Sequence, residues 1–185
     1  MEKSLFRKVL VTGATGFLGS HLIPILKEQL DAEIVPVGRQ QYDLMRPGEP
    51  ERMVQEVRPD AVIHMAARVG GIIANKKYPA EFFFENIVSN TQTFHACYQN
   101  GVKKFVTVIG GCSYPAKATS PIDTDQMWNG VPQQESAPYS VAKKMMLIQS
   151  EAYRRQYGFN SVVLIPGNVY GEYDNFNEEY SHVIP

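Results

Sequence analysis

Two short motifs contain the residue types with the clearest chemical use. The first is Gly13-Ala14-Thr15-Gly16-Phe17-Leu18-Gly19, a GxxGxxG run that follows an apolar segment and opens a helical pattern. Glycines allow a tight turn and close approach of the backbone, and a helix N-terminus attracts phosphate through its free N–H groups. The run predicts a loop that binds the pyrophosphate of a dinucleotide, and the expected contacts are Gly13, Thr15, Gly16, Phe17, Leu18 and Gly19. A glycine-rich turn without a ligand is the alternative.

The second motif is Tyr139-Ser140-Val141-Ala142-Lys143, which places a phenol and an ammonium one helical turn apart on the same face. An ordinary tyrosine has a pKa of about 10 and is a poor acid–base catalyst at neutral pH. A nearby ammonium lowers that pKa by stabilising the phenolate, and it can also donate to ribose hydroxyls. The pattern alone is common on surface helices, so its weight comes from its place after the fourth strand of a dinucleotide-binding fold.

The end of the second expected strand indicates which dinucleotide is bound. Enzymes that use NAD place a carboxylate there for the ribose 2′-hydroxyl, whereas this chain has Gly38 and Arg39. A guanidinium suits a 2′-phosphate, so we expect NADP(H) as the cofactor. Asp43 and Leu44 are expected beside the adenine. A solvated surface arginine and an exposed turn aspartate are the alternatives.

The elements that must position these residues follow an alternating pattern. Apolar runs predict strands at 8–12, 33–37, 61–64, 105–109 and 161–165, and helical patterns begin near 17 and cover 79–100 and 139–157. The fold class is α/β, a doubly wound parallel sheet of the Rossmann type. Right-handed crossovers predict the order 3-2-1-4-5, with a ligand crevice at the carboxyl ends of strands 1 and 4. Pro24 should kink the helix that begins near residue 17, and Pro36 weakens the assignment of the second strand. The loop at 110–138 is long enough to be functional.

Composition narrows the class of protein. With 44% hydrophobic and 20% charged residues, the chain of 185 residues is expected to form one dinucleotide-binding domain over 1–185. A net charge of −1 without a basic stripe argues against nucleic-acid or membrane partners. No spacing of residues suits a metal site. Two cysteines cannot build a disulfide framework, and the start of the chain lacks a signal-peptide pattern. We therefore expect a cytoplasmic protein. The apolar end at 181–185 suggests a truncated chain.

Several motifs together resemble those of the GDP-L-fucose synthases, which are extended short-chain dehydrogenase/reductases. They are the glycine loop, the YxxxK pair, Cys112-Ser113-Tyr114-Pro115, Val69-Gly70-Gly71-Ile72, and the stretch from Asp174-Asn175-Phe176 to Ser181-His182-Val183-Ile184-Pro185. The resemblance covers essentially the whole chain. It implies an NADP-dependent 3,5-epimerase and 4-reductase for a GDP-linked 4-keto-6-deoxy sugar, a homodimer, and a C-terminal substrate domain that is largely absent here.

The resemblance also implies residue roles. Cys112 and His182 would move protons at C3 and C5 of the sugar, and Tyr139 with Lys143 would protonate the C4 oxygen during reduction. Taken singly, Cys112 could be a small buried thiol and His182 an ordinary histidine; His21, His64 and His95 match no catalytic motif. Beyond the glycine loop, Arg39, Asp43 and Leu44, the implied cofactor contacts are Ala66, Ala67, Gly110, Gly111, Tyr139, Lys143, Pro166, Asn168, Val169 and His182.

One departure from the family pattern concerns the reduction step. The family has a serine four residues before the tyrosine of its CxYP motif, where this chain has Gly110 followed by Gly111. A glycine cannot supply the hydroxyl that orients the C4 carbonyl. A sugar-nucleotide epimerase with little net reduction, acting for instance on a heptose, is therefore a second hypothesis. A cofactor-binding module without catalysis is a third.

Overall fold

Five parallel strands form one sheet in the computed structural model, which describes residues 5–182. The strands are β1 (Lys8–Thr12), β2 (Glu33–Val37), β3 (Ala61–His64), β4 (Lys104–Val108) and β5 (Ser161–Leu164). The helices are α1 (Phe17–Gln29), α2 (Glu49–Val57), α3 (Ile72–Lys77), α4 (Pro79–Gln99) and α5 (Ala137–Tyr157). The α/β fold with a doubly wound parallel sheet is confirmed. The domain predicted over 1–185 stays a prediction, and its residues 1–4 and 183–185 lie outside the described part.

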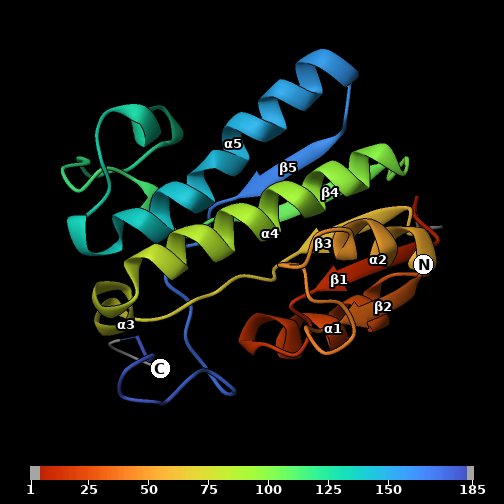
Figure 1. Cartoon of the computed structure of the whole chain (residues 1–185), viewed down its shortest axis with the longest axis horizontal. Coiled ribbons are helices and arrows are strands. Elements are labelled where there is room, and N and C mark those ends of the chain that lie inside the picture. Colours follow the sequence, from red (N-terminus) through yellow and green to blue (C-terminus); the bar gives the residue numbers. More distant parts are fainter. Residues whose placement is uncertain (1–4, 183–185) are drawn as a thin grey trace.

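The expected strand order is wrong, because the sheet runs β2-β1-β3-β4-β5. β3 pairs with β1 on the side opposite to β2, with Val9 level with Ala61, so the chain reverses direction after β2. The reversal places α1 on one face of the sheet, while α2, α4 and α5 cover the other (Figure 1). The switch in direction lies between β1 and β3, so the crevice predicted at strands 1 and 4 opens there instead.

The observed strand order explains why β2 tolerates a proline at position 36. β2 pairs with β1 alone, at the edge of the described sheet, and Pro36 stands level with Val11. Proline cannot donate to a sheet ladder, and it is tolerated where its missing N–H would face solvent. An inner position for β2, as in the expected order, would have needed that N–H.

Two apolar cores lie on the two faces of the sheet. Val9 and Val11 pack with α1, and Leu10 points to the opposite core, which contains Phe94, Phe105 and Met146 among others. Successive side chains of a strand point to opposite faces of the sheet, so neighbouring residues of β1 enter different cores. Because both faces are buried, residues 9–11 form a continuous apolar run.

The predicted helices are present, and two short ones are additional. α1 continues through Pro24 to Gln29, α4 ends at Gln99, and Gly101 follows with a φ of +72°. α2 and α3 were not individually expected. The long loop contains three short 3₁₀ helices, at Gly111–Ser113, Thr124–Trp128 and Gln134–Ser136. Over residues 5–182, no helix is long and apolar enough to cross a membrane, and no group of three or more His, Cys, Asp or Glu residues could hold a metal ion.

Candidate functional site

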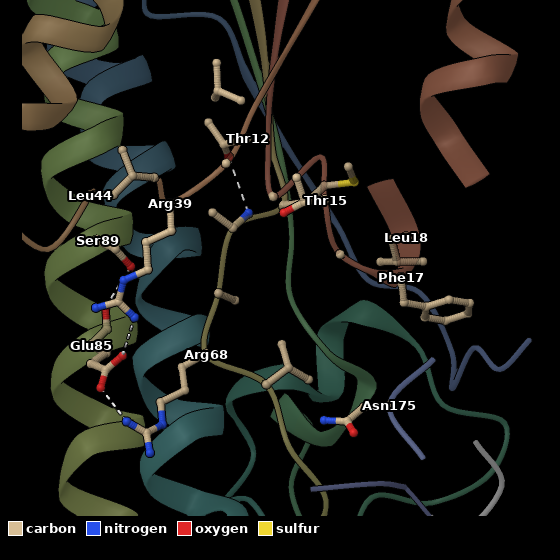
Figure 2. A pocket seen from close by; sticks show the side chains of 18 of the residues that line it. Thr12, Thr15, Phe17, Leu18, Arg39, Leu44, Arg68, Glu85, Ser89 and Asn175 are labelled. Atoms are coloured by element: carbon tan, nitrogen blue, oxygen red, sulfur yellow. Dashed lines mark hydrogen bonds and ion pairs between the residues drawn. The ribbon is translucent and has the colours of Figure 1, made fainter. Parts of the chain in front are cut away.

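A cavity of about 730 Å³ opens at the carboxyl ends of β1, β2 and β3. Its walls come from the glycine loop, the turn after β2, the segment after β3, one face of α4 and the C-terminal segment (Figure 2). Carboxyl ends beside a switch in strand direction are where open α/β sheets bind ligands. A volume of this size can enclose a large part of a dinucleotide.

The glycine loop is shaped by close backbone contacts. Gly13 has a φ of +70°, and a Cβ there would lie 2.7 Å from the backbone nitrogen of Ala66. A Cβ on Gly19 would lie 2.4 Å from the carbonyl oxygen of Ala14, so this glycine lets α1 pack onto its own loop. Gly16 is the N-cap of α1 and contributes no side-chain cap bond, which leaves the first N–H groups of the helix available to an anion.

A buried polar row holds the loop against β3. The Thr12 hydroxyl lies 2.8 Å from Nδ1 of His64, and Nε2 of His64 lies 2.9 Å from the side-chain oxygen of Asn90. The backbone N–H of Ala66 donates to the Thr12 hydroxyl at 3.3 Å (Figure 2). Burial, together with the charge of Lys143, lowers the pKa of His64 to about 3, so this imidazole is neutral at physiological pH. His64 therefore positions the cavity wall, in agreement with its lack of a catalytic motif.

Arg39 lies in the wall of the cavity. Its Nε is 3.5 Å from a carboxylate oxygen of Asp43, and one terminal nitrogen is 4.0 Å from a carboxylate oxygen of Glu85. Arg39 keeps 70% of its side chain exposed, so it can turn toward an incoming anion. Leu44 is buried in the adjacent wall.

Tyr139 and Lys143 lie one turn apart on α5, where Tyr139 is half-buried and Lys143 is buried. The ring of Tyr139 packs edge-on against Phe82, with centroids 6.2 Å apart. Lys143 is 1% exposed, and its ammonium has no hydrogen-bond partner among residues 5–182. Burial lowers the pKa of Lys143 to about 8. Burial, with the nearby Cys112, raises the pKa of Tyr139, which is opposite to the lowering expected from Lys143.

Cys112 takes up space that Gly110 leaves free. A Cβ built on Gly110 would lie 2.9 Å from the sulfur of Cys112 and 4.0 Å from a ring carbon of Tyr139. Cys112 keeps solvent contact, yet partial burial of its thiol raises its pKa, while Ser140 and the charge of Lys143 act in the opposite direction. The structure thus brings Cys112, Tyr139 and Lys143 into one cluster.

The two most family-specific motifs contact each other. The N–H of Gly71 donates to the carbonyl of Tyr180 at 2.8 Å, and a Cβ on Gly71 would lie 1.9 Å from the carbonyl oxygen of Ser181. The ring of Tyr180 stacks on Tyr78 with centroids 6.3 Å apart. This contact closes one side of the cavity, and His182 lies in the same wall. The last three residues of the motif, 183–185, lie outside the described part.

Comparisons with known proteins agree with this geometry. The family model described as the NAD dependent epimerase/dehydratase family matches residues 9–185. The chain belongs to this family. It is 38% identical over 186 residues to the GDP-L-fucose synthase of Dictyostelium discoideum, a match that covers 100% of this chain and 58% of that protein. The resemblance predicted from the motifs is confirmed.

Solved structures of related proteins have the same fold. A GDP-L-fucose synthetase from Naegleria fowleri bound to NADP superposes with a TM-score of 0.87 at 32% identity, over 96% of this chain and 58% of that one. A GDP-D-glycero-L-gluco-heptose synthase from Campylobacter jejuni, crystallised in the presence of NADPH, gives 0.89 at 29% identity, over 96% and 52%. The chain thus spans slightly more than half the length of these relatives.

Within this family fold, the predicted site residues divide into two groups. The cavity is lined by Gly13, Thr15, Gly16, Phe17, Leu18, Arg39, Asp43, Leu44, Ala66, Ala67, Val169 and His182. Outside its wall lie Gly19, Gly110, Gly111, Cys112, Tyr139, Lys143, Pro166 and Asn168. No hydrogen bond or ion pair between described residues joins His182 to the cluster around Cys112. The cofactor and catalytic roles of these residues stay predictions.

Sequence reasoning missed a charged part of the cavity wall. Arg68 follows the Ala66-Ala67 pair after β3, and Glu85 and Ser89 project from α4 (Figure 2). Arg68 could have been noted as a basic residue at the carboxyl end of a strand. The sequence around Glu85 contains no pattern that indicates a binding residue, because Glu85 faces the cavity only once α4 packs beside β3. Asn175, Tyr173 and Tyr180 also line the cavity.

Proposed function

We propose that this chain is the cofactor-binding part of an NADP-dependent epimerase/reductase that acts on a GDP-linked 4-keto-6-deoxy sugar. The observation that carries the proposal is the buried, unpartnered ammonium of Lys143 beside Tyr139. A buried charge without a partner is costly, and a ribose hydroxyl of a bound nucleotide would supply the missing acceptor. The family match and the names of the relatives support the substrate class.

The residues present fit a nicotinamide dinucleotide. Gly13 and Gly16 would hold the pyrophosphate at the start of α1, Arg39 would face the 2′-phosphate, and Lys143 would bind the nicotinamide ribose. NADPH would supply a hydride for the reduction. Tyr139 would give its proton to the sugar C4 oxygen, and the charge of Lys143 would stabilise the phenolate that remains.

The proton exchange at carbon would belong to Cys112 and His182. Protons next to a ketone are acidic, and inversion needs a base on one face of the ring and an acid on the other. A thiolate at Cys112 can take such a proton, and the positive charge of Lys143 favours that thiolate. His182, which lies in the cavity wall, would return a proton from the opposite face.

The test follows both half-reactions at once. The purified protein is incubated with NADPH and GDP-4-keto-6-deoxymannose in D₂O, and NADPH absorbance and deuterium at C3 and C5 are recorded. Tyr139→Phe should abolish NADPH oxidation and keep deuterium uptake, and Cys112→Ser should suppress the uptake. Loss of both signals together in Tyr139→Phe would contradict the division of roles.

Gly110 favours a second candidate, an epimerase with little net reduction. The position that holds a serine in the related enzymes has no side chain, and the sulfur of Cys112 lies 2.9 Å from the point where a Cβ would stand. Deuterium uptake without NADPH oxidation in the unmodified protein would support this candidate. A protein that binds NADPH and shows neither signal would instead be a binding module.

We further propose a homodimer in the cytoplasm, on the strength of the family resemblance. Phe83, Phe84 and Ile148 on α4 and α5 are exposed apolar side chains that a second copy could cover. Light scattering coupled to size exclusion measures the mass in solution, and a monomer at micromolar concentration would contradict the proposed dimer.

A further inference from the structure

Glu85 lies between two arginines in the cavity wall. One of its carboxylate oxygens is 4.0 Å from a terminal nitrogen of Arg39, and the other accepts a close hydrogen bond from Arg68. All three side chains line the cavity, and they reach it from the turn after β2, from α4 and from the segment after β3 (Figure 2). The two guanidinium groups thus converge on a single carboxylate.

Arg68 is held firmly in this position. The side-chain amide of Asn86 accepts from its backbone N–H at 3.2 Å and donates to its carbonyl at 3.0 Å. Its guanidinium lies over the rings of Phe82 and Tyr78, at 5.1 and 5.6 Å from their centroids. With 24% of the side chain exposed, Arg68 is a fixed cation that an anion in the cavity can reach.

The neighbouring acids are less free to leave their partners. Asp43 accepts the backbone N–H of Met45 at 3.2 Å and pairs with Arg46 as well as Arg39, so it stabilises its own turn. Glu81 pairs with Arg68 at 3.2 Å but is not part of the cavity wall. Within the described part of the chain, the carboxylate of Glu85 has these two arginines as its partners. Glu85 is therefore the carboxylate that another anion can replace.

We propose that Glu85 is an internal competitor for the 2′-phosphate of the cofactor. It pairs with Arg39 and Arg68, and a phosphomonoester displaces it by offering both arginines a dianion. The same carboxylate can accept a hydrogen bond from a free ribose 2′-hydroxyl. Glu85 therefore narrows the preference for NADP(H) over NAD(H) that the arginines create. This inference rests on the proposed dinucleotide cofactor.

Two nucleotides that differ only at the 2′ position test the proposal. Adenosine 2′,5′-bisphosphate and AMP are titrated into the protein by isothermal calorimetry, so the readout is affinity. Glu85→Gln keeps the size of the side chain and removes its charge. We expect it to bind the bisphosphate about tenfold more tightly, equivalent to about 1.4 kcal/mol, because the carboxylate charge that competes for the two arginines is removed. AMP should bind equally or more weakly.

Glu81→Gln is the matched control, since it removes a partner of Arg68 outside the cavity wall. It should change the affinity for the bisphosphate less than Glu85→Gln does, and a thermal melt confirms that both variants fold. Unchanged or weaker bisphosphate binding in Glu85→Gln would overturn the inference while leaving the cofactor proposal intact. An unmodified protein that binds neither nucleotide would overturn both.

Discussion

At the scale of single residues, the buried ammonium of Lys143 carries an electrostatic cost. Its ammonium is buried, and burial lowers its pKa from 10.5 to about 8. Between these two pH values the unfolded chain holds a proton that the folded chain has lost, so folding stability rises with pH across this window. Below pH 8 the full cost of the buried charge is present. A ligand that supplies an acceptor removes that cost, which links cofactor binding to stability.

Lys143→Met should therefore stabilise the ligand-free protein at pH 7. The gain should approach roughly 3 kcal/mol, which is the cost implied by the lowered pKa, and it should disappear above about pH 10.5. Urea unfolding of both proteins at pH 7 and pH 10.5 measures the difference. The variant should lose NADPH affinity at the same time. A variant less stable than the unmodified protein at pH 7 would show that Lys143 contributes to folding rather than opposing it.

Gly110→Ser should increase reduction relative to proton exchange. The new Cβ would lie 2.9 Å from the sulfur of Cys112, so the thiol must rotate before the hydroxyl can face the substrate carbonyl. An oriented donor to a developing oxyanion is worth about 2.7–4 kcal/mol in other enzymes, and we expect at least a tenfold faster NADPH oxidation. Gly110→Ala adds the same Cβ without the hydroxyl. An equal increase in both variants would assign the effect to the displaced thiol.

At the scale of elements, the sequence predicted what is encoded locally. The glycine loop is contiguous, Tyr139 and Lys143 are one helical turn apart, and Arg39 follows its strand directly, so each could be placed before the fold was known. The strand order could not be predicted in this way. A right-handed crossover after β2 can place β3 either beyond β2 or on the opposite side of β1. Pro36 held the missing information, since a proline inside a strand favours an edge. Glu85 became part of the site only through packing.

The edge position of β2 yields a prediction. Pro36→Val should change the free energy of unfolding by no more than about 0.5 kcal/mol, because the added N–H has no neighbouring strand to bind among the described residues. The variant should self-associate more strongly, since prolines protect exposed sheet edges. Urea unfolding and sedimentation velocity measure the two effects. A gain in stability of 1 kcal/mol or more would indicate that the new N–H finds an acceptor and that β2 is not an edge.

At the scale of the whole molecule, the cavity depends on two segments that are distant in the sequence. Residues 70–71 and 180–182 meet through a backbone hydrogen bond, and they are joined further by the pairing of Lys77 with Glu179 at 2.9 Å. His21 reaches the same C-terminal segment, with its Nε2 2.9 Å from the carbonyl of Glu172. The C-terminal segment therefore bridges the glycine-loop helix α1 and the segment after β3. Binding at the cavity should depend on this bridge.

Gly71→Ala tests the bridge directly. The backbone at Gly71 is ordinary for any residue, with a φ of −66°, so the only obstacle is the contact of the new Cβ with the carbonyl oxygen of Ser181 at 1.9 Å. Forcing them apart should cost about 1–3 kcal/mol, which the chain can avoid by releasing residues 177–182. We expect faster proteolysis of this segment and a several-fold weaker affinity for NADPH, measured by mass spectrometry of limited digests and by fluorescence titration. Gly167→Ala is the control, since a Cβ there meets nothing within 4 Å. Unchanged proteolysis together with unchanged NADPH affinity in Gly71→Ala would show that the C-terminal segment is not a wall that the ligand needs.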